Sequence, residues 1–168
     1  MKYAKALVMI CFLFTVIGIT QVTMADNIND FLMQENQLQQ LLEVRDSQAG
    51  FVGISGQVWK VEPLGRWFVA QFVNTQIQEP YLNGQLTREH LKALDRAFAE
   101  QDFTELPNRF GRDLEVNPRT LTIRFGAIEK SLVLNAGENL ETVTLEPSQL
   151  ENFRRFRNLF QSIMTILQ

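Results

Sequence analysis

The chain has 168 residues, with 16 Lys and Arg against 19 Asp and Glu, and a formal net charge of −3. This length suits about one domain, large enough to bury a core of its own. Because an acidic chain gains no general electrostatic attraction to nucleic acid, nucleic acid is not expected as a partner.

Residues 1–25 follow the order of a secretory signal peptide. Lys2 and Lys5 give a short positive start, residues 6–19 form an uncharged apolar run, and Thr23-Met24-Ala25 places small residues at the cleavage-determining positions. The run is too short for a comfortable bilayer span, so no stable membrane insertion is expected after cleavage. The mature chain, whose charge becomes −5 without the two lysines, is expected to be exported, either to the periplasm or as a secreted protein.

The only cysteine, Cys11, lies in this leader, so the mature chain is expected to have no disulfide, thiol nucleophile or thiolate metal ligand. The preceding residues, Val8-Met9-Ile10, lack the small residue that a lipoprotein cleavage site needs. Lipid attachment at Cys11 is therefore not expected. An exported protein without disulfides is typical of bacteria.

The next segment, residues 26–40, is polar and rich in Asn and Gln. Its apolar residues fall partly at helical spacing, so a short helix and a flexible lead-in both fit. A single domain is expected over residues 41–168, beginning with a strand at 41–45. Three glycines at every third position of residues 47–56 favour a turn or an adaptable loop there.

Two strongly apolar strands are expected at residues 58–62 and 67–73, joined by Pro63-Leu64-Gly65. Both faces of these strands carry apolar side chains, with Trp59 and Trp67 on one face. Either other parts of the chain cover both faces, or one face is an interface.

The second half of the chain begins with a helix from Arg88 to about Gln101, capped by Thr87. A charged loop is expected at 108–117. Strands at 120–125 and 128–134 then form a hairpin around Gly126-Ala127, with Lys130 interrupting the apolar face near the strand's end.

The last helix, about 149–167, follows an acidic connection and is expected to start at a capping box made by Ser148 and Glu151. The element order is therefore βββαββα. It predicts an α+β domain, an antiparallel sheet of about five strands with two helices packed mainly on one face.

Catalytic, metal and cofactor signatures do not stand out, so the chain is expected to be non-enzymatic, with no cofactor and no metal. His90 is the only histidine and has the position of a solvated helix residue. Neither Ser55 nor Ser131 lies in a nucleophile-elbow pattern. With one histidine and no mature cysteine, zinc would have to be held by carboxylates, which is uncommon.

The candidate interface residues come from the glycine loop and the aromatic hairpin. Mobile loops often present binding residues, and Trp and Arg dominate binding hot spots. The candidates are Gly50, Phe51, Gly53, Trp59, Arg66 and Trp67. Core packing is the competing interpretation of the aromatic residues, and an indole exposed beside Arg66 would indicate a partner surface.

A set of motifs spans residues 41–167: Val44-Arg45, Gly50-Phe51-Val52-Gly53, Trp59, Gly65, Gly84-Gln85-Leu86-Thr87, Ala99, Asp102-Phe103, Leu106-Pro107, Asn117-Pro118 and Phe125-Gly126. This pattern resembles the emfourin-like group of small bacterial proteins, some of which inhibit thermolysin-like metalloproteases. The resemblance implies the same strand, glycine turn, helix, hairpin and last helix. The chain departs from the group in Gln48-Ala49-Gly50, where a paired glycine is expected, in a longer stretch at 75–82, and in its leader and polar segment. No inhibitory residue is carried over.

Three functions from different classes remain open. The first is an exported domain that binds a protein, with a restrained exported protease as the partner that the resemblance implies. It would present residues 48–55 or the acidic strip 135–145. The second is a structural or assembly component of the cell envelope, held by the aromatic hairpin. The third, favoured least, is a hydrolase that uses carboxylates such as Glu105 and Asp113.

Overall fold

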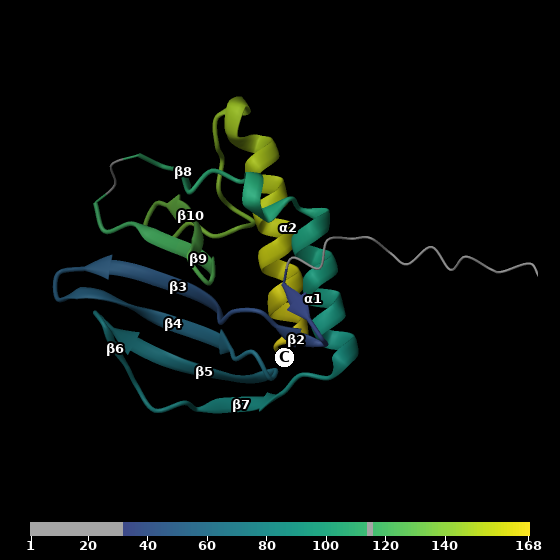
Figure 1. Cartoon of the computed structure of the whole chain (residues 1–168). Helices are drawn as coiled ribbons and strands as arrows, with labels where there is room; N and C mark the ends of the chain where they lie inside the picture. Colours follow the sequence, from purple (N-terminus) through teal and green to yellow (C-terminus); the bar gives the residue numbers. More distant parts are fainter. Residues whose placement is uncertain (1–31, 114–115) are drawn as a thin grey trace, which may run out of the picture.

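The structure of the protein is a computed structural model, and it describes residues 32–113 and 116–168. The expected signal peptide and the possible caps Asn29 and Asp30 lie outside the described residues. The fold is α+β, as expected, with a large sheet on one side and two helices packed on one of its faces (Figure 1).

The described residues form ten strands in two sheets. They are β1 (Met33–Gln34), β2 (Gln37–Leu38), β3 (Leu42–Gly50), β4 (Gly53–Val61), β5 (Arg66–Val73), β6 (Gln76–Ile77), β7 (Leu82–Gln85), β8 (Arg109–Gly111), β9 (Arg119–Phe125) and β10 (Ile128–Leu134). The large sheet has the order β6-β5-β4-β3-β9-β10-β8, with β7 also paired to β5. Its pairs are antiparallel except for β10 with β8.

The expectation of about five strands was therefore too low. The five long strands, β3, β4, β5, β9 and β10, have seven to nine residues each. They lie where strands were expected, but β3 and β4 extend into residues 47–56, where a turn or an adaptable loop was expected. The five additional strands have only two to four residues. Such short segments are set by pairing with a neighbour, because they are too short to display an alternating pattern of their own.

The two helices are α1 (Arg88–Glu100) and α2 (Leu150–Ile166). Thr87 caps α1 as predicted, accepting a hydrogen bond from the backbone N–H of His90 at 3.2 Å. Both helices contribute apolar residues to one large core together with β3, β4 and β9. We call the sheet face toward the helices the inner face and the opposite one the outer face.

The last helix begins differently from the prediction. Pro147–Gln149 forms a short 3-10 turn, η2, so Gln149 occupies the N-cap and makes no side-chain cap bond. The Gln149 side chain instead accepts from the backbone N–H of Gly111 at 2.8 Å, and Glu151 pairs with Arg154 at 2.8 Å. The predicted capping box of Ser148 and Glu151 is absent because the 3-10 turn places Ser148 before the N-cap.

Residues 32–40 form the small β1–β2 hairpin in place of the helix or flexible lead-in expected there. Leu32, Met33 and Leu38 are buried in the large core. The backbone N–H of Leu32 also donates to Asp95 Oδ1 of α1 at 2.9 Å, in a buried position. These contacts make the segment part of the domain.

Lys130 and the charged loop also differ from expectation. Lys130 is buried at the third position of β10, well inside the strand. Its ammonium group donates to the carbonyls of Thr104 and Leu106 and to Asn108 Oδ1. The predicted loop at 108–117 contains β8, which runs parallel to β10 at the sheet edge. Lys130 thus fastens the segment before β8 to the sheet.

Both apolar faces of β4 and β5 are covered within the chain. On the inner face, Val61 and Val69 are buried, and Trp59 and Trp67 pack against the large core. On the outer face, Val58, Ala70 and Phe72 form a second small cluster, against which Phe68 and Ile77 pack. The apolar residues on two faces therefore do not require a partner.

Candidate interaction surfaces

Residues 47–56, where a turn or an adaptable loop was predicted, are paired strand except for a two-residue turn at the end of a long hairpin. Strands β3 and β4 pair from Leu42↔Val61 as far as Gly50↔Gly53, leaving Phe51 and Val52 as a two-residue turn. The strands extend beyond the helices at this end of the sheet (Figure 1). We call residues 50–54 the hairpin tip.

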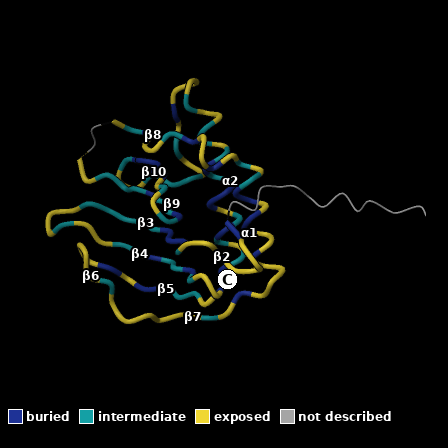
Figure 2. The backbone as a smooth tube through the Cα atoms, viewed as in Figure 1, coloured by how far each residue is buried: buried dark blue, intermediate teal, exposed yellow. Residues whose placement is uncertain are grey.

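The hairpin tip exposes apolar side chains. Phe51 is completely exposed, at 105% of its reference area, and Val52 is 81% exposed. Ile54 and the nearby Val73 of β5 are also exposed. The turn between β3 and β4 is coloured as exposed in Figure 2. Scattered surface apolar residues are common, but here three of them lie at one end of the β3–β4 hairpin and the fourth lies at the adjoining end of β5.

Residues next to the ends of β5 and β9 hold the hairpin tip in place. Asn74 Oδ1 accepts from the backbone N–H of Ile54 at 3.0 Å, and the Asn74 backbone N–H donates to the Ile54 carbonyl at 2.6 Å. On the other side, the Ala49 N–H donates to the carbonyl of Pro118 at 2.9 Å. Gly53 has φ of +117°, a conformation that favours glycine. The tip is therefore presented in a preset conformation.

The structure brings only part of the predicted interface together. Gly50, Phe51 and Gly53 share the hairpin tip, whereas Trp59 lies six residues farther along β4, roughly 20 Å away at the spacing of an extended strand. Trp67 lies beneath Gly84, where an added Cβ would approach the indole nitrogen to 2.8 Å. Both tryptophans are partly buried against the core, and the exposed Arg66 pairs with Glu62 at 2.6 Å.

The residues considered for catalysis are not assembled into a site. His90 is exposed on α1, and Ser55 is exposed on β4. Ser131 is on the outer face of β10, opposite the helices, and its hydroxyl is hydrogen-bonded to that of Thr122 at 3.0 Å. Glu105 and Asp113 are both exposed.

Within 32–113 and 116–168, no group of three or more His, Cys, Asp and Glu side chains is arranged to hold a metal ion. None of the helices in these same ranges has the length and apolar character needed to cross a membrane.

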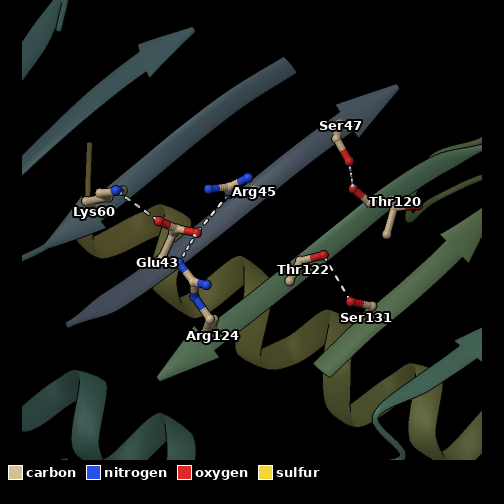
Figure 3. Close-up of polar contacts among 8 residues, drawn as sticks. All are labelled: Glu43, Arg45, Ser47, Lys60, Thr120, Thr122, Arg124 and Ser131. Atoms are coloured by element: carbon tan, nitrogen blue, oxygen red, sulfur yellow. Dashed lines mark hydrogen bonds and ion pairs between the residues drawn. The ribbon is translucent and has the colours of Figure 1, made fainter. Parts of the chain in front are cut away.

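The sequence reasoning missed a cluster of charges on the outer face. Glu43 is only 2% exposed, and it lies directly opposite Lys60 of β4 and Arg124 of β9. Its carboxylate accepts from Arg45 Nε at 2.8 Å and Arg124 Nη2 at 2.7 Å, and Lys60 Nζ is 3.1 Å away (Figure 3). We call Arg45, Lys60 and Arg124 the outer-face cations.

Burial raises the pKa of Glu43, but the contact with Lys60, the hydrogen bond from Arg45 and the charges of Arg45 and Arg124 outweigh it. The pKa therefore lies below its ordinary value of 4.5, and the carboxylate is ionised at neutral pH. The only signal in the sequence was the Glu43-x-Arg45 spacing, because the other two cations reach Glu43 through strand register.

A hydroxyl ladder continues from this cluster. Ser47 Oγ donates to the carbonyl of Thr120 at 3.0 Å, next to the hydrogen bond between Thr122 and Ser131 (Figure 3). These residues lie on β3, β9 and β10. This half of the outer face is polar, in contrast to the apolar cluster on β4 and β5.

A groove of about 630 Å³ lies between α2 and the start of β9. Its apolar wall consists of Leu121, Leu140, Phe160 and Met164. Its cation, Arg119, is engaged by both oxygens of Asp46, at 2.8 and 2.5 Å, and by the carbonyl of Glu138 at 3.0 Å. The guanidinium therefore makes its hydrogen bonds within the protein and has few N–H donors left for a ligand.

The acidic strip 135–145 also makes contacts within the domain. Glu138 pairs with Arg112 at 2.7 Å and accepts from the backbone N–H of Asn135 at 2.8 Å. The hydrogen bond from Arg112 holds the pKa of Glu138 below its ordinary value. Two segments, residues 48–55 and residues 135–145, were predicted to face a partner. The first of them, at the end of the β3–β4 hairpin, is thus the freer to contact one.

Comparisons with known proteins add no assignment: no family model matches the chain, and no curated protein matches it. The resemblance to the emfourin-like group therefore stays a prediction from the sequence motifs.

Proposed function

We propose that the protein is an exported, non-enzymatic domain that binds another protein through the hairpin tip. The observation that supports this best is the complete exposure of Phe51 on a tip that residues next to the ends of β5 and β9 hold in place. An exposed aromatic side chain loses its contact with water when a partner's pocket receives it. Because the tip is preset, little conformational freedom is lost on binding.

The partner that we propose is an exported protease, restrained in the manner of the emfourin-like group. A protruding hairpin of two paired strands is a shape that fits an active-site cleft. The proposal rests on the sequence resemblance for the class of partner and on the hairpin tip for the contact.

The test is a titration of a thermolysin-like metalloprotease with the mature chain, Asp26 to Gln168, and with Phe51→Ser. We expect the wild type to inhibit and Phe51→Ser to raise the inhibition constant by roughly tenfold or more, the range of a binding hot spot. The matched control is Leu64→Ser, which removes another exposed apolar side chain, 64% exposed, at the opposite end of the β4–β5 hairpin.

Affinity capture from the exported fraction of the source runs beside this titration. Capture of a protease by the wild type and the control, but not by Phe51→Ser, supports the proposal. Equal capture by all three proteins contradicts the role of the hairpin tip. Capture of an envelope protein in place of a protease would favour the alternative of an assembly component.

A further inference from the structure

The outer-face cations hold more positive charge than the carboxylate they surround. Glu43 carries one negative charge, whereas Arg45, Lys60 and Arg124 carry three positive charges. On the other strands of this face, Arg66 and Glu62 neutralise each other. Glu129 of β10 lies directly opposite Arg124 and adds one negative charge at the edge of the cluster, and Arg109 of β8, opposite Ser131, adds one positive charge. The face is therefore positive on a chain whose net charge is −3.

Most of the hydrogen-bond donors in this cluster have no hydrogen-bond acceptor among the described residues. A guanidinium has five N–H donors and an ammonium group three. Each outer-face cation directs one contact at Glu43, and no other hydrogen bond or ion pair of these three residues is found in the described part of the chain. Their side chains are 33%, 20% and 39% exposed for Arg45, Lys60 and Arg124, so solvent reaches them.

The cations are also held in place before any ligand arrives. Arg45 and Arg124 both donate to the same oxygen, Oε1 of Glu43, which makes their guanidinium groups neighbours. The Arg45 guanidinium lies over the ring of Phe72, 5.1 Å from its centre. A carboxylate from outside can bridge two such guanidinium groups with little loss of side-chain freedom.

We propose that the outer face around Glu43 is a docking surface for an acidic segment of a partner protein. The inference rests on charge complementarity. The patch is positive although the chain is acidic, so it attracts Asp and Glu side chains of a partner. The cluster crosses three adjacent strands, about 10 Å at the strand spacing, which two acidic side chains of one short segment can span. This surface is separate from the hairpin tip, and the inference does not depend on the proposed function.

The test uses a fluorescent hexaglutamate peptide and the mature chain, with binding followed by anisotropy at low and then rising salt. We expect binding that weakens with salt, since the contacts are partly exposed charges. The double variant Arg45→Gln/Arg124→Gln should weaken it by roughly tenfold. The control Arg96→Gln/Arg154→Gln makes the same charge change at exposed positions of the helices and should leave it nearly unchanged.

A second variant should strengthen peptide binding, whereas the double variant should weaken it. Glu43→Gln keeps all three outer-face cations and removes the anion that they share, so the peptide should bind several-fold more tightly. A cluster that served only the fold would not predict this gain. Circular dichroism confirms that each variant is folded before binding is measured, and Glu43→Gln decides the question if the double variant does not fold.

Three results would overturn the inference: no binding of hexaglutamate by the wild type, no gain with Glu43→Gln, or an equal loss with the helix control. Single-stranded DNA and vesicles containing phosphatidylglycerol serve as competing probes. Tighter binding of either one than of the peptide would reject an acidic protein segment as the occupant.

Discussion

Glu43 is a buried carboxylate on the sheet face opposite the two described helices, and its three cationic neighbours shield it from solvent. Removing one partner from a buried charge cluster is costly because the remaining charges lose their compensation. The cost is reduced here because the outer-face cations are themselves partly exposed and screened by water.

We expect Glu43→Gln to lower the free energy of unfolding at pH 7 by about 1–3 kcal/mol. Because the folded-state pKa of Glu43 lies below its ordinary value of 4.5, its contribution is complete above that pH and is lost as the pH falls through the folded-state pKa. Urea unfolding of both proteins at pH 7 and at acid pH measures this. A difference between them that stays constant as the pH falls below 4.5 would contradict the assignment.

Lys130 shows at the same scale how a pattern can mislead. It stands in an apolar position of an alternating strand, and the simplest interpretation placed it near the strand's end. Burial lowers the pKa of its ammonium group, while the charge of Glu105 acts in the opposite direction. Three oxygens from residues 104–108 satisfy its donors, and only the folded path of that segment brings them there.

At the scale of elements, the β3–β4 hairpin depends on a close approach of its two backbones. Gly56 lies opposite Ser47, and an added Cβ would stand 2.0 Å from the carbonyl oxygen of Asp46. Gly50, by contrast, lies opposite Gly53, where the nearest atom to an added Cβ is 3.8 Å away. The glycines of this run therefore have different roles.

Gly56→Ala should destabilise the protein by about 1–3 kcal/mol, the range for forcing a side chain into occupied space. Gly50→Ala is its matched control, with ordinary van der Waals contact, and should change the stability by less than about 0.5 kcal/mol. Chemical denaturation of both variants gives the comparison. Equal losses would mean that flexibility, and not close approach, explains the glycines.

On the scale of the whole molecule, the helices cover one end of the long strands and leave the hairpin tip outside (Figure 2). The core is closed at the covered end by residues 32–40, which bury Leu32, Met33 and Leu38 against it. This short polar segment is thus a structural part of the domain, although it lies before the residues expected to form the fold.

A chain that begins at Leu41 should lose most of its stability relative to one that begins at Asp26. Each fully buried apolar side chain contributes about 1.5–3 kcal/mol, and three of them approach the total of about 5–15 kcal/mol for a typical domain. Thermal unfolding followed by circular dichroism measures the difference. The exposed substitution Gln37→Ala in the full mature chain is the control, and an unchanged melting temperature after truncation would contradict this role.

The sequence by itself determined the α+β class, the order of the five long strands and two helices, and the Thr87 cap, since each depends on local periodicity or on one turn of backbone. Tertiary structure alone decided the short strands, the burial of Lys130 and the cluster around Glu43. Their partners are distant in sequence, as with Glu43 and Arg124, 81 residues apart, and strand register brings them together. The physical reason is that a local pattern specifies which face a side chain takes, whereas pairing between strands specifies what it meets there.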